Sequence, residues 1–127
     1  MAERRAILFD LDDTLYPLER FVMSGFRAVA AAVDARWRVP RAAALETLVS
    51  AVAASRGREL QVLAERHGLA ADVVPELVDV IRRHVPELRL PELSLSVLGA
   101  LRRDWRLGVV TNGRPDIQAR KVRALRC

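Results

Sequence analysis

The chain has 127 residues, of which 51% are hydrophobic and 29% charged, and it contains a single cysteine. This composition excludes a disordered chain, a collagen-like repeat and a scaffold held together by disulfides. No apolar run reaches the roughly 18 uncharged residues that a membrane-spanning helix needs, so the sequence predicts a cytoplasmic protein without membrane contact. The net charge of +5 is concentrated after residue 100, where eight basic residues stand against two acidic ones.

The basic excess raises the question of nucleic-acid binding. Of the 21 basic residues, all but Lys121 are arginines, and the aromatic residues do not alternate with the basic cluster as a stacking surface for single strands requires. An arginine bias of this kind is typical of GC-rich coding. The sequence therefore argues against nucleic acid as the partner.

A strand pattern opens the chain and helical patterns follow it. Residues 6–9 form a wholly apolar run, which predicts a strand buried on both faces of a parallel sheet. Pro40 suits the first position of a helix, and Pro86 and Pro91 frame an extended connector. Apolar residues at helical spacing predict four helices before that connector, over residues 18–37, 40–55, 59–67 and 72–85.

Beyond the connector the pattern changes to helix, strand and helix. Ser94 is predicted to cap the first of these helices, and residues 106–111 predict a second buried strand. Pro115 opens the last helix after the turn Asn112-Gly113. This order predicts an α/β fold with a helical insertion after the first strand.

Three carboxylates directly follow the first strand, where ligand sites of open α/β sheets lie. Asp10 and Asp12 are two positions apart, so in an extended segment they point to the same side, one available as a nucleophile and the other as a proton donor. A divalent cation would relieve their mutual repulsion. An equally weighted alternative is that Asp12 and Asp13 are turn residues whose carboxylates accept hydrogen bonds from nearby backbone N–H groups.

The sequence resembles the haloacid dehalogenase superfamily in two motifs. Its first motif, an apolar strand followed by D-x-D-x-T, resembles residues 9–17 (FDLDDTLYP), and its second, an apolar strand ending in Ser or Thr, resembles residues 107–113 (LGVVTNG). The helices between them resemble the cap that one branch of the superfamily inserts at this point. The resemblance implies a partial Rossmann-like core of residues 1–17 and 92–127 with two parallel strands, and a helical cap of residues 18–91.

The resemblance also implies residue roles. Asp10 would attack a phosphoryl group and become an aspartyl phosphate, and Asp12 would protonate the leaving oxygen and then deprotonate the hydrolytic water. Thr111, with Asn112 beside it, would bind the phosphate. The family's cofactor, Mg²⁺, would be held by the carboxylate of Asp10 and the backbone carbonyl of Asp12. The dehalogenases lack an Asp at the position of Asp12, so the implied substrate is a small phosphorylated metabolite.

Two further motifs of the superfamily, a Lys or Arg and then an acidic group, lie downstream of the second, and no acidic residue follows Asp116 here. We therefore expect weak or absent activity and an open sheet edge that favours self-association. Lys121 lies at the border of the last apolar helical stripe, which favours a lysine extending to solvent over a catalytic one. The alternative function is a non-catalytic relative that acts as an interaction module.

Overall fold

The computed structural model describes residue 3 and residues 5–127, which form two compact units. The core unit contains the described residues up to Val22 together with Val85–Cys127, and the helical unit is Met23–His84. The helical unit is shorter at both ends than the predicted cap of residues 18–91. The reason is that Phe21, Leu88 and Leu90 contribute to the hydrophobic cluster of the core unit.

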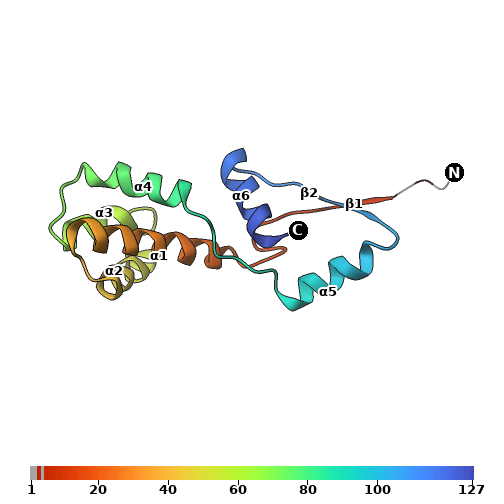
Figure 1. Ribbon diagram of the computed structural model, residues 1–127, viewed down its shortest axis with the longest axis horizontal. Coiled ribbons are helices and arrows are strands. Elements are labelled where there is room, and N and C mark those ends of the chain that lie inside the picture. Colours follow the sequence, from red (N-terminus) through yellow and green to blue (C-terminus); the bar gives the residue numbers. More distant parts are fainter. Residues whose placement is uncertain (1–2, 4) are drawn as a thin grey trace. The chain divides into compact units, whose positions relative to one another are not determined.

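The core unit is built on a parallel pair of strands, β1 (Ala6–Phe9) and β2 (Arg106–Val109) (Figure 1). Phe9 lies opposite Val109, and both pack in a cluster with Leu98 of α5 (Glu92–Leu101) and Val122 of α6 (Pro115–Leu125). The side chains of β1 and β2 on this face thus pack with both neighbouring helices. The predicted α/β fold with two parallel strands is confirmed.

The opposite face of the sheet is exposed. Leu8 is 66% exposed, so the prediction that the first strand is buried on both faces is wrong. Val110, within the predicted second buried strand, is 56% exposed and lies just beyond β2. The cluster that includes Phe9 and Val109 also contains residues of α5 and α6, so both helices pack against the same side of the sheet.

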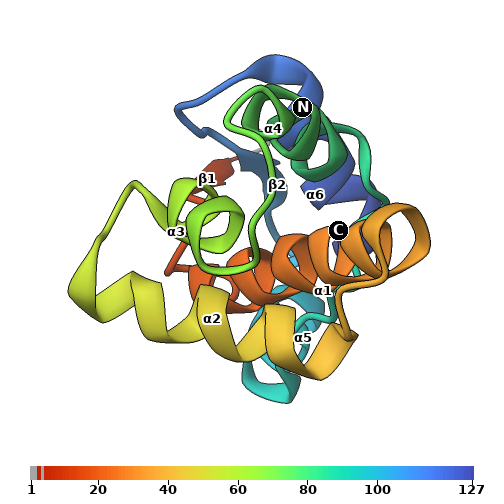
Figure 2. The same ribbon diagram turned by 90° about the vertical axis from the view of Figure 1, so that its left-hand side faces the viewer.

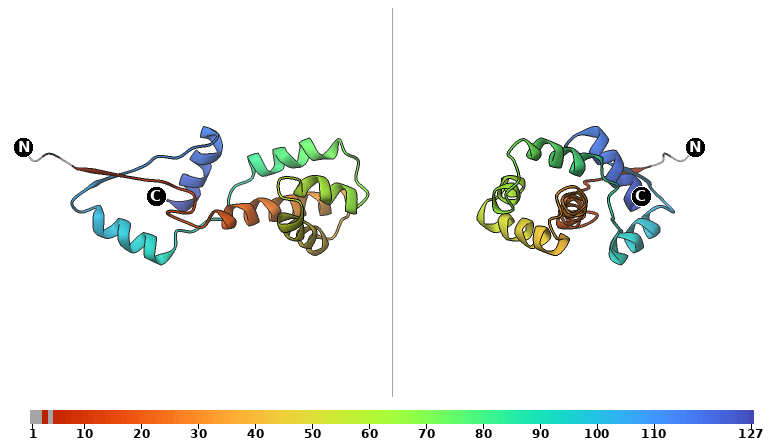
Figure 3. Two further views of the ribbon diagram at one scale, coloured as in Figure 1. Left: turned by 180° about the vertical axis from the view of Figure 1, so that it is seen from behind. Right: turned by 60° about the vertical axis from the view of Figure 1, so that its left-hand side comes forward.

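The helical unit packs around α1, which begins in the core unit. Its elements are α1 (Leu18–Trp37), α2 (Arg41–Ala54), α3 (Glu59–Arg66) and α4 (Val73–Arg83). Figure 2 shows α2 and α3 side by side, and the right-hand view of Figure 3 looks nearly along α1 with the other three helices around it. The fully buried side chains include Val29, Val33, Leu48, Leu63 and Leu77. None of the helices among the described residues combines the length and the hydrophobicity that a membrane span requires.

Two helix starts differ from the predicted ones. Pro40 occupies the position before the first helical residue of α2, and α5 starts at Glu92 with Pro91 before it. Ser94 therefore lies inside the first turn of α5 and does not cap the helix. Its hydroxyl donates instead to the backbone carbonyl of Leu15, at 2.6 Å. This bond ties α5 to the loop that follows β1.

Candidate active site

The loop after β1 is anchored by three buried side chains. Leu11 is 0% exposed, Leu15 5% and Tyr16 2%. The backbone N–H of Leu15 donates to the carbonyl of Leu11 at 3.0 Å, and that of Asp13 donates to the carbonyl of Tyr16 at 2.9 Å. Asp13 takes a left-handed conformation with φ +60°, which Asp tolerates better than most residues. These contacts fix the directions in which the carboxylates of the loop project.

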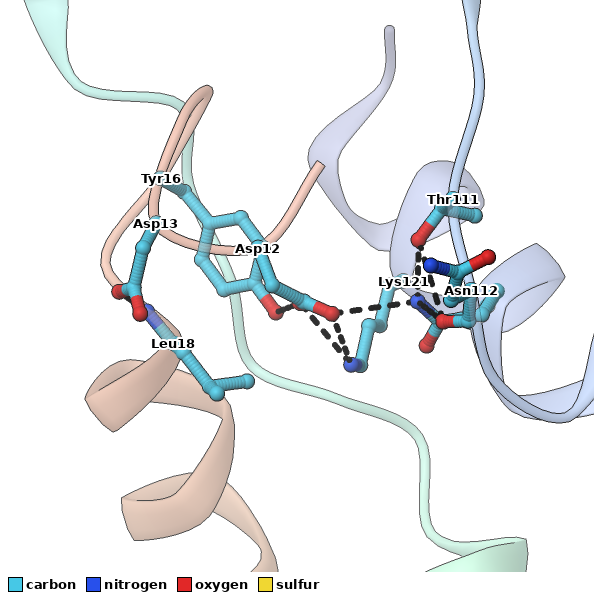
Figure 4. Close-up of polar contacts among 8 residues, drawn as sticks. Asp12, Asp13, Tyr16, Leu18, Thr111, Asn112 and Lys121 are labelled. Carbon is cyan, nitrogen blue, oxygen red and sulfur yellow. Dashed lines mark hydrogen bonds and ion pairs between the residues drawn. The ribbon is translucent and has the colours of Figure 1, made fainter. Parts of the chain in front are cut away.

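Asp13 serves the fold of α1. Its Oδ1 accepts a hydrogen bond from the backbone N–H of Leu18 at 2.8 Å, where a helix start leaves amide groups without a partner in the helix (Figure 4). The interpretation of Asp13 as a turn residue is therefore confirmed. For Asp12 the same interpretation is wrong, because its carboxylate accepts hydrogen bonds from side chains, two of them on α6.

The carboxylate of Asp12 is held by three donors (Figure 4). Tyr16 donates its hydroxyl to Oδ1 at 2.6 Å, and the Nζ of Lys121 lies 3.0 Å from Oδ1 and 3.2 Å from Oδ2. Gln118 donates from Nε2 to Oδ2 at 3.2 Å. Tyr16 belongs to the loop itself, whereas Lys121 and Gln118 come from α6. The site therefore joins the N-terminal and the C-terminal segments of the core unit.

These donors set the charge of the site. Burial by itself would raise the pKa of Asp12, but the hydrogen bonds from Tyr16, Lys121 and Gln118 and the charge of Lys121 outweigh it and hold the pKa below its usual value. Burial and the neighbouring Asp12 carboxylate raise the pKa of Tyr16 far above its ordinary value. At neutral pH the site therefore contains an ionised Asp12 and a neutral Tyr16 that donates to it.

Lys121 is buried, and the prediction that it extends to solvent is wrong. Its side chain is 6% exposed, and Nζ lies 4.3 Å from the centroid of the Phe21 ring as well as against Asp12. A buried ammonium needs a counter-charge and a polarisable neighbour, and the two residues supply them. Helical spacing showed only that Lys121 borders the apolar stripe. The loop that carries Asp12 onto that stripe could not be derived from periodicity.

Thr111 and Asn112 reach the same network through Gln118. The Nε2 of Gln118 lies 2.6 Å from Oγ1 of Thr111 and 3.0 Å from the backbone carbonyl oxygen of Asn112. The structure thus brings Asp12 and Thr111, one from each predicted motif, onto one amide group. Sequence reasoning missed Gln118. The signal that could have found it is its spacing from Lys121, three residues along one helix face, just after the Thr111 strand end.

Asp10 lies outside this network. Its side chain is exposed, and Thr14 donates its hydroxyl to Oδ2 of Asp10 over 3.4 Å, longer than a good hydrogen bond between two oxygens. This long contact lies within the loop itself. The carboxylate of Asp10 is available for chemistry, whereas that of Asp12 is saturated with donors.

A magnesium ion fits these residues only in part. Among the described residues, no three His, Cys, Asp or Glu side chains come together as a set of metal ligands. The exposed carboxylate of Asp10 suits an ion that keeps most of its waters, as Mg²⁺ does. The carboxylate of Asp12 does not suit a metal, because Lys121 already neutralises it. Its implied contribution through the backbone carbonyl is compatible with this arrangement.

The sequence of the chain matches the family model of haloacid dehalogenase-like hydrolases over residues 4–126. The chain belongs to this hydrolase family. The match spans both units and includes the loop of Asp10 and Asp12 as well as the strand end at Thr111, so the family resemblance of the two motifs is confirmed. A comparison with curated proteins finds no significant match. In a haloacid dehalogenase-like hydrolase, the carboxyl ends of β1 and β2 are where a catalytic site is expected.

Proposed function

We propose that this haloacid dehalogenase-like chain hydrolyses phosphomonoesters in a Mg²⁺-dependent reaction through an aspartyl phosphate on Asp10. The observation that carries the proposal is the shared amide of Gln118, which links the carboxylate of Asp12 to the hydroxyl of Thr111 at the carboxyl ends of two parallel strands. An exposed carboxylate, Asp10, directly precedes this network. Asp10 would supply the nucleophile, Asp12 the proton carrier and Thr111 the donor to the phosphate.

The proposed reaction has two steps. In the fraction of chains whose Asp12 carboxyl is protonated, an oxygen of Asp10 forms a bond to phosphorus while the ester oxygen leaves and takes that proton. A water molecule then attacks phosphorus and gives a proton to Asp12, while the bond between phosphorus and Asp10 breaks. Inorganic phosphate departs, and the Asp10 carboxylate is restored. Because the pKa of Asp12 is lowered, the ionised form that the second step needs predominates at neutral pH, and the protonated form that the first step needs is scarce. This asymmetry agrees with the expectation of weak activity.

A bound Mg²⁺ would offset the negative charge of the phosphate and of Asp10. The Asp10 carboxylate and the Asp12 backbone carbonyl are the groups that would hold it. Thr111 would donate its hydroxyl to a phosphoryl oxygen, with Asn112 beside it. Lys121 keeps Asp12 from repelling the phosphate, since the pair carries no net charge.

The substrate class in this proposal is a small phosphorylated metabolite. The predicted cap, residues 18–91, would exclude water from the reacting group and select the leaving group. The proposal includes a cytoplasmic location, which cell fractionation tests. Screening a panel of nucleotide and sugar phosphates would define the leaving group.

Turnover of a generic aryl phosphate with and without Mg²⁺ tests the proposed activity. We expect slow Mg²⁺-dependent release of phosphate that Asp10→Asn abolishes. Asp13→Asn is the matched control, because it keeps an oxygen to accept the hydrogen bond from Leu18 and should retain the activity. Equal turnover by Asp10→Asn, or a wild-type chain that neither turns over the ester nor binds phosphate with Mg²⁺, would contradict the proposal.

A second candidate, an interaction module, is favoured by the exposed face of the sheet. Leu8 and Val110 are more than half exposed there, and parallel strands with open edges tend to pair with other chains. We propose self-association through this face and edge. Sedimentation velocity should show a concentration-dependent larger species that Leu8→Lys reduces. A wild-type chain that sediments as a monomer at all concentrations removes this candidate.

A further inference from the structure

The side chain of Gln118 is enclosed by groups that require it to donate. It is 6% exposed, and its Nε2 faces the carboxylate of Asp12, the backbone carbonyl of Asn112 and the hydroxyl of Thr111. An ionised carboxylate and a carbonyl can only accept hydrogen bonds. The end of the Gln118 amide that faces them must therefore be its NH₂ group, and the orientation of the amide is fixed by chemistry.

This orientation determines what the hydroxyl of Thr111 can do. The NH₂ group of Gln118 has two hydrogens for its three acceptors, so two of the acceptors share one hydrogen. The shortest of the three contacts is the one to Oγ1 of Thr111, at 2.6 Å, so the hydroxyl accepts on that side and keeps its own proton for another partner. The partner in the structure is the carbonyl of Asn112 at 3.4 Å, too long for a strong bond. A small rotation of the O–H bond would bring the proton to an incoming anion at little cost.

Gly113 makes room for this arrangement. Its φ of +126° is a conformation that favours glycine, and a Cβ built on it would lie 3.3 Å from Cδ and 3.4 Å from Cγ of Gln118. Any side chain at position 113 would thus crowd the stem of Gln118. The turn after β2 and the glutamine on α6 form one packed unit, independent of the hydrogen bonds.

We propose that Gln118 is a positioning residue that fixes Asp12 relative to Thr111 and presents the Thr111 hydroxyl as a donor to phosphate. This inference rests on the proposed function for its ligand, but its structural part holds for the chain alone. Without the amide of Gln118, the hydroxyl of Thr111 loses the donor that fixes its orientation, and its proton is no longer directed to the phosphate. Gln118 touches neither the phosphate nor Asp10 in this account and acts through Thr111.

The first test needs no ligand and no substitution. In the wild-type chain, the side-chain NH₂ of Gln118 should exchange with solvent at least about tenfold more slowly than that of Gln61, the other glutamine, which lies half-buried on α3. Nuclear magnetic resonance of the two side-chain amides measures both rates in one sample. Equal exchange rates would overturn the inference.

The second test follows the rotamer of Thr111 through three-bond couplings to its methyl carbon. We expect a single rotamer in the wild-type chain and averaged couplings in Gln118→Met, which keeps the volume and removes the donor. Gln61→Met is the matched control and should leave Thr111 unchanged. Unaltered couplings of Thr111 in Gln118→Met would overturn the inference, whether or not the chain binds phosphate.

The third test separates an action through Thr111 from a general structural role. Binding of inorganic phosphate with Mg²⁺, followed by calorimetry, should weaken about tenfold on Gln118→Met, as loss of one hydrogen bond to an anion predicts. In a Thr111→Val background the same substitution should weaken binding less than about twofold. Equal losses in both backgrounds would overturn the inference. If the wild-type chain binds no phosphate, the proposed function fails, and the two ligand-free tests still decide the role of Gln118.

Discussion

Nζ of Lys121 lies 3.0 and 3.2 Å from the two carboxylate oxygens of Asp12, although 109 positions separate the residues in sequence. The contact pairs the loop that follows the first strand with the last helix of the chain. Because both side chains are largely withdrawn from water, the pair matters for the fold of the core unit as well as for the charge of the site.

Lys121→Met should destabilise the core unit by about 2–3 kcal/mol, because it leaves a partly buried carboxylate without its counter-charge. Trp105 belongs to the core unit, so its fluorescence in a Trp37→Phe background follows the denaturant unfolding of that unit. Arg114→Met, at the N-cap of the same helix, is the control, since the Arg114–Asp116 pair is 54% and 51% exposed and should contribute less than about 1 kcal/mol. A loss for Lys121→Met as small as for Arg114→Met would contradict the account.

The lowered pKa of Asp12 predicts an acid-dependent loss of stability. A carboxylate whose folded pKa lies below its unfolded value stabilises the fold above the unfolded pKa, here 3.8, and that contribution is lost as the pH falls through the folded pKa. The free energy of unfolding of the core unit should therefore fall below about pH 4, and Asp12→Asn should flatten this part of the profile. An unchanged profile in Asp12→Asn would mean that other carboxylates cause the acid sensitivity.

Tyr16→Phe should raise the pKa of Asp12, because the hydroxyl at 2.6 Å stabilises the ionised carboxylate. The lost hydrogen bond to a charged group should cost about 1.5–3 kcal/mol of stability. Titration of the Asp12 carboxyl carbon by nuclear magnetic resonance measures the pKa. Thr14→Val is the control, since the hydroxyl of Thr14 donates to Asp10 and its removal should leave the pKa of Asp12 unchanged.

Two glycine substitutions should change the stability of the core unit in opposite directions. Gly113→Ala should destabilise the core unit by about 1–2 kcal/mol, because an L side chain is strained at φ +126° and meets Gln118. Gly99→Ala, inside α5 with no atom within 4 Å of a built Cβ, should stabilise it by up to about 1 kcal/mol through helix propensity. Both are read from thermal unfolding. A Gly113→Ala chain as stable as the wild type would remove the packing argument for Gln118.

Local sequence patterns predicted the elements closely. The first strand, residues 6–9, and the first helix, residues 18–37, have the predicted bounds, because apolar runs and helical spacing are local signals. Helix starts at prolines differed by one position or more, as at Pro40 and Pro91. The exposure of Leu8 differed from the predicted burial for another reason, since burial of a strand face depends on which helices lie over it.

The candidate site was only half visible in the sequence. Asp12 and Thr111 stood out because they follow apolar strands, and the structure links them through Gln118. Gln118 did not stand out, and Lys121 was predicted to extend to solvent, because a polar residue on a helix usually faces water. Their burial depends on the carboxylate of Asp12, which a loop brings to them from the other end of the chain. Such a contact between distant segments leaves no periodic signal in the sequence.

Trapping the proposed aspartyl phosphate tests the proposed reaction most directly. The chain is incubated with Mg²⁺ and a reactive small phosphomonoester or acyl phosphate, and borohydride then reduces any acyl phosphate to the corresponding alcohol. Mass spectrometry of the fragment that contains residues 9–17 locates the change. We expect modification at Asp10, dependent on Mg²⁺ and absent in Asp10→Asn. Modification at another residue, or none in a chain shown to bind phosphate with Mg²⁺, would contradict the proposed reaction.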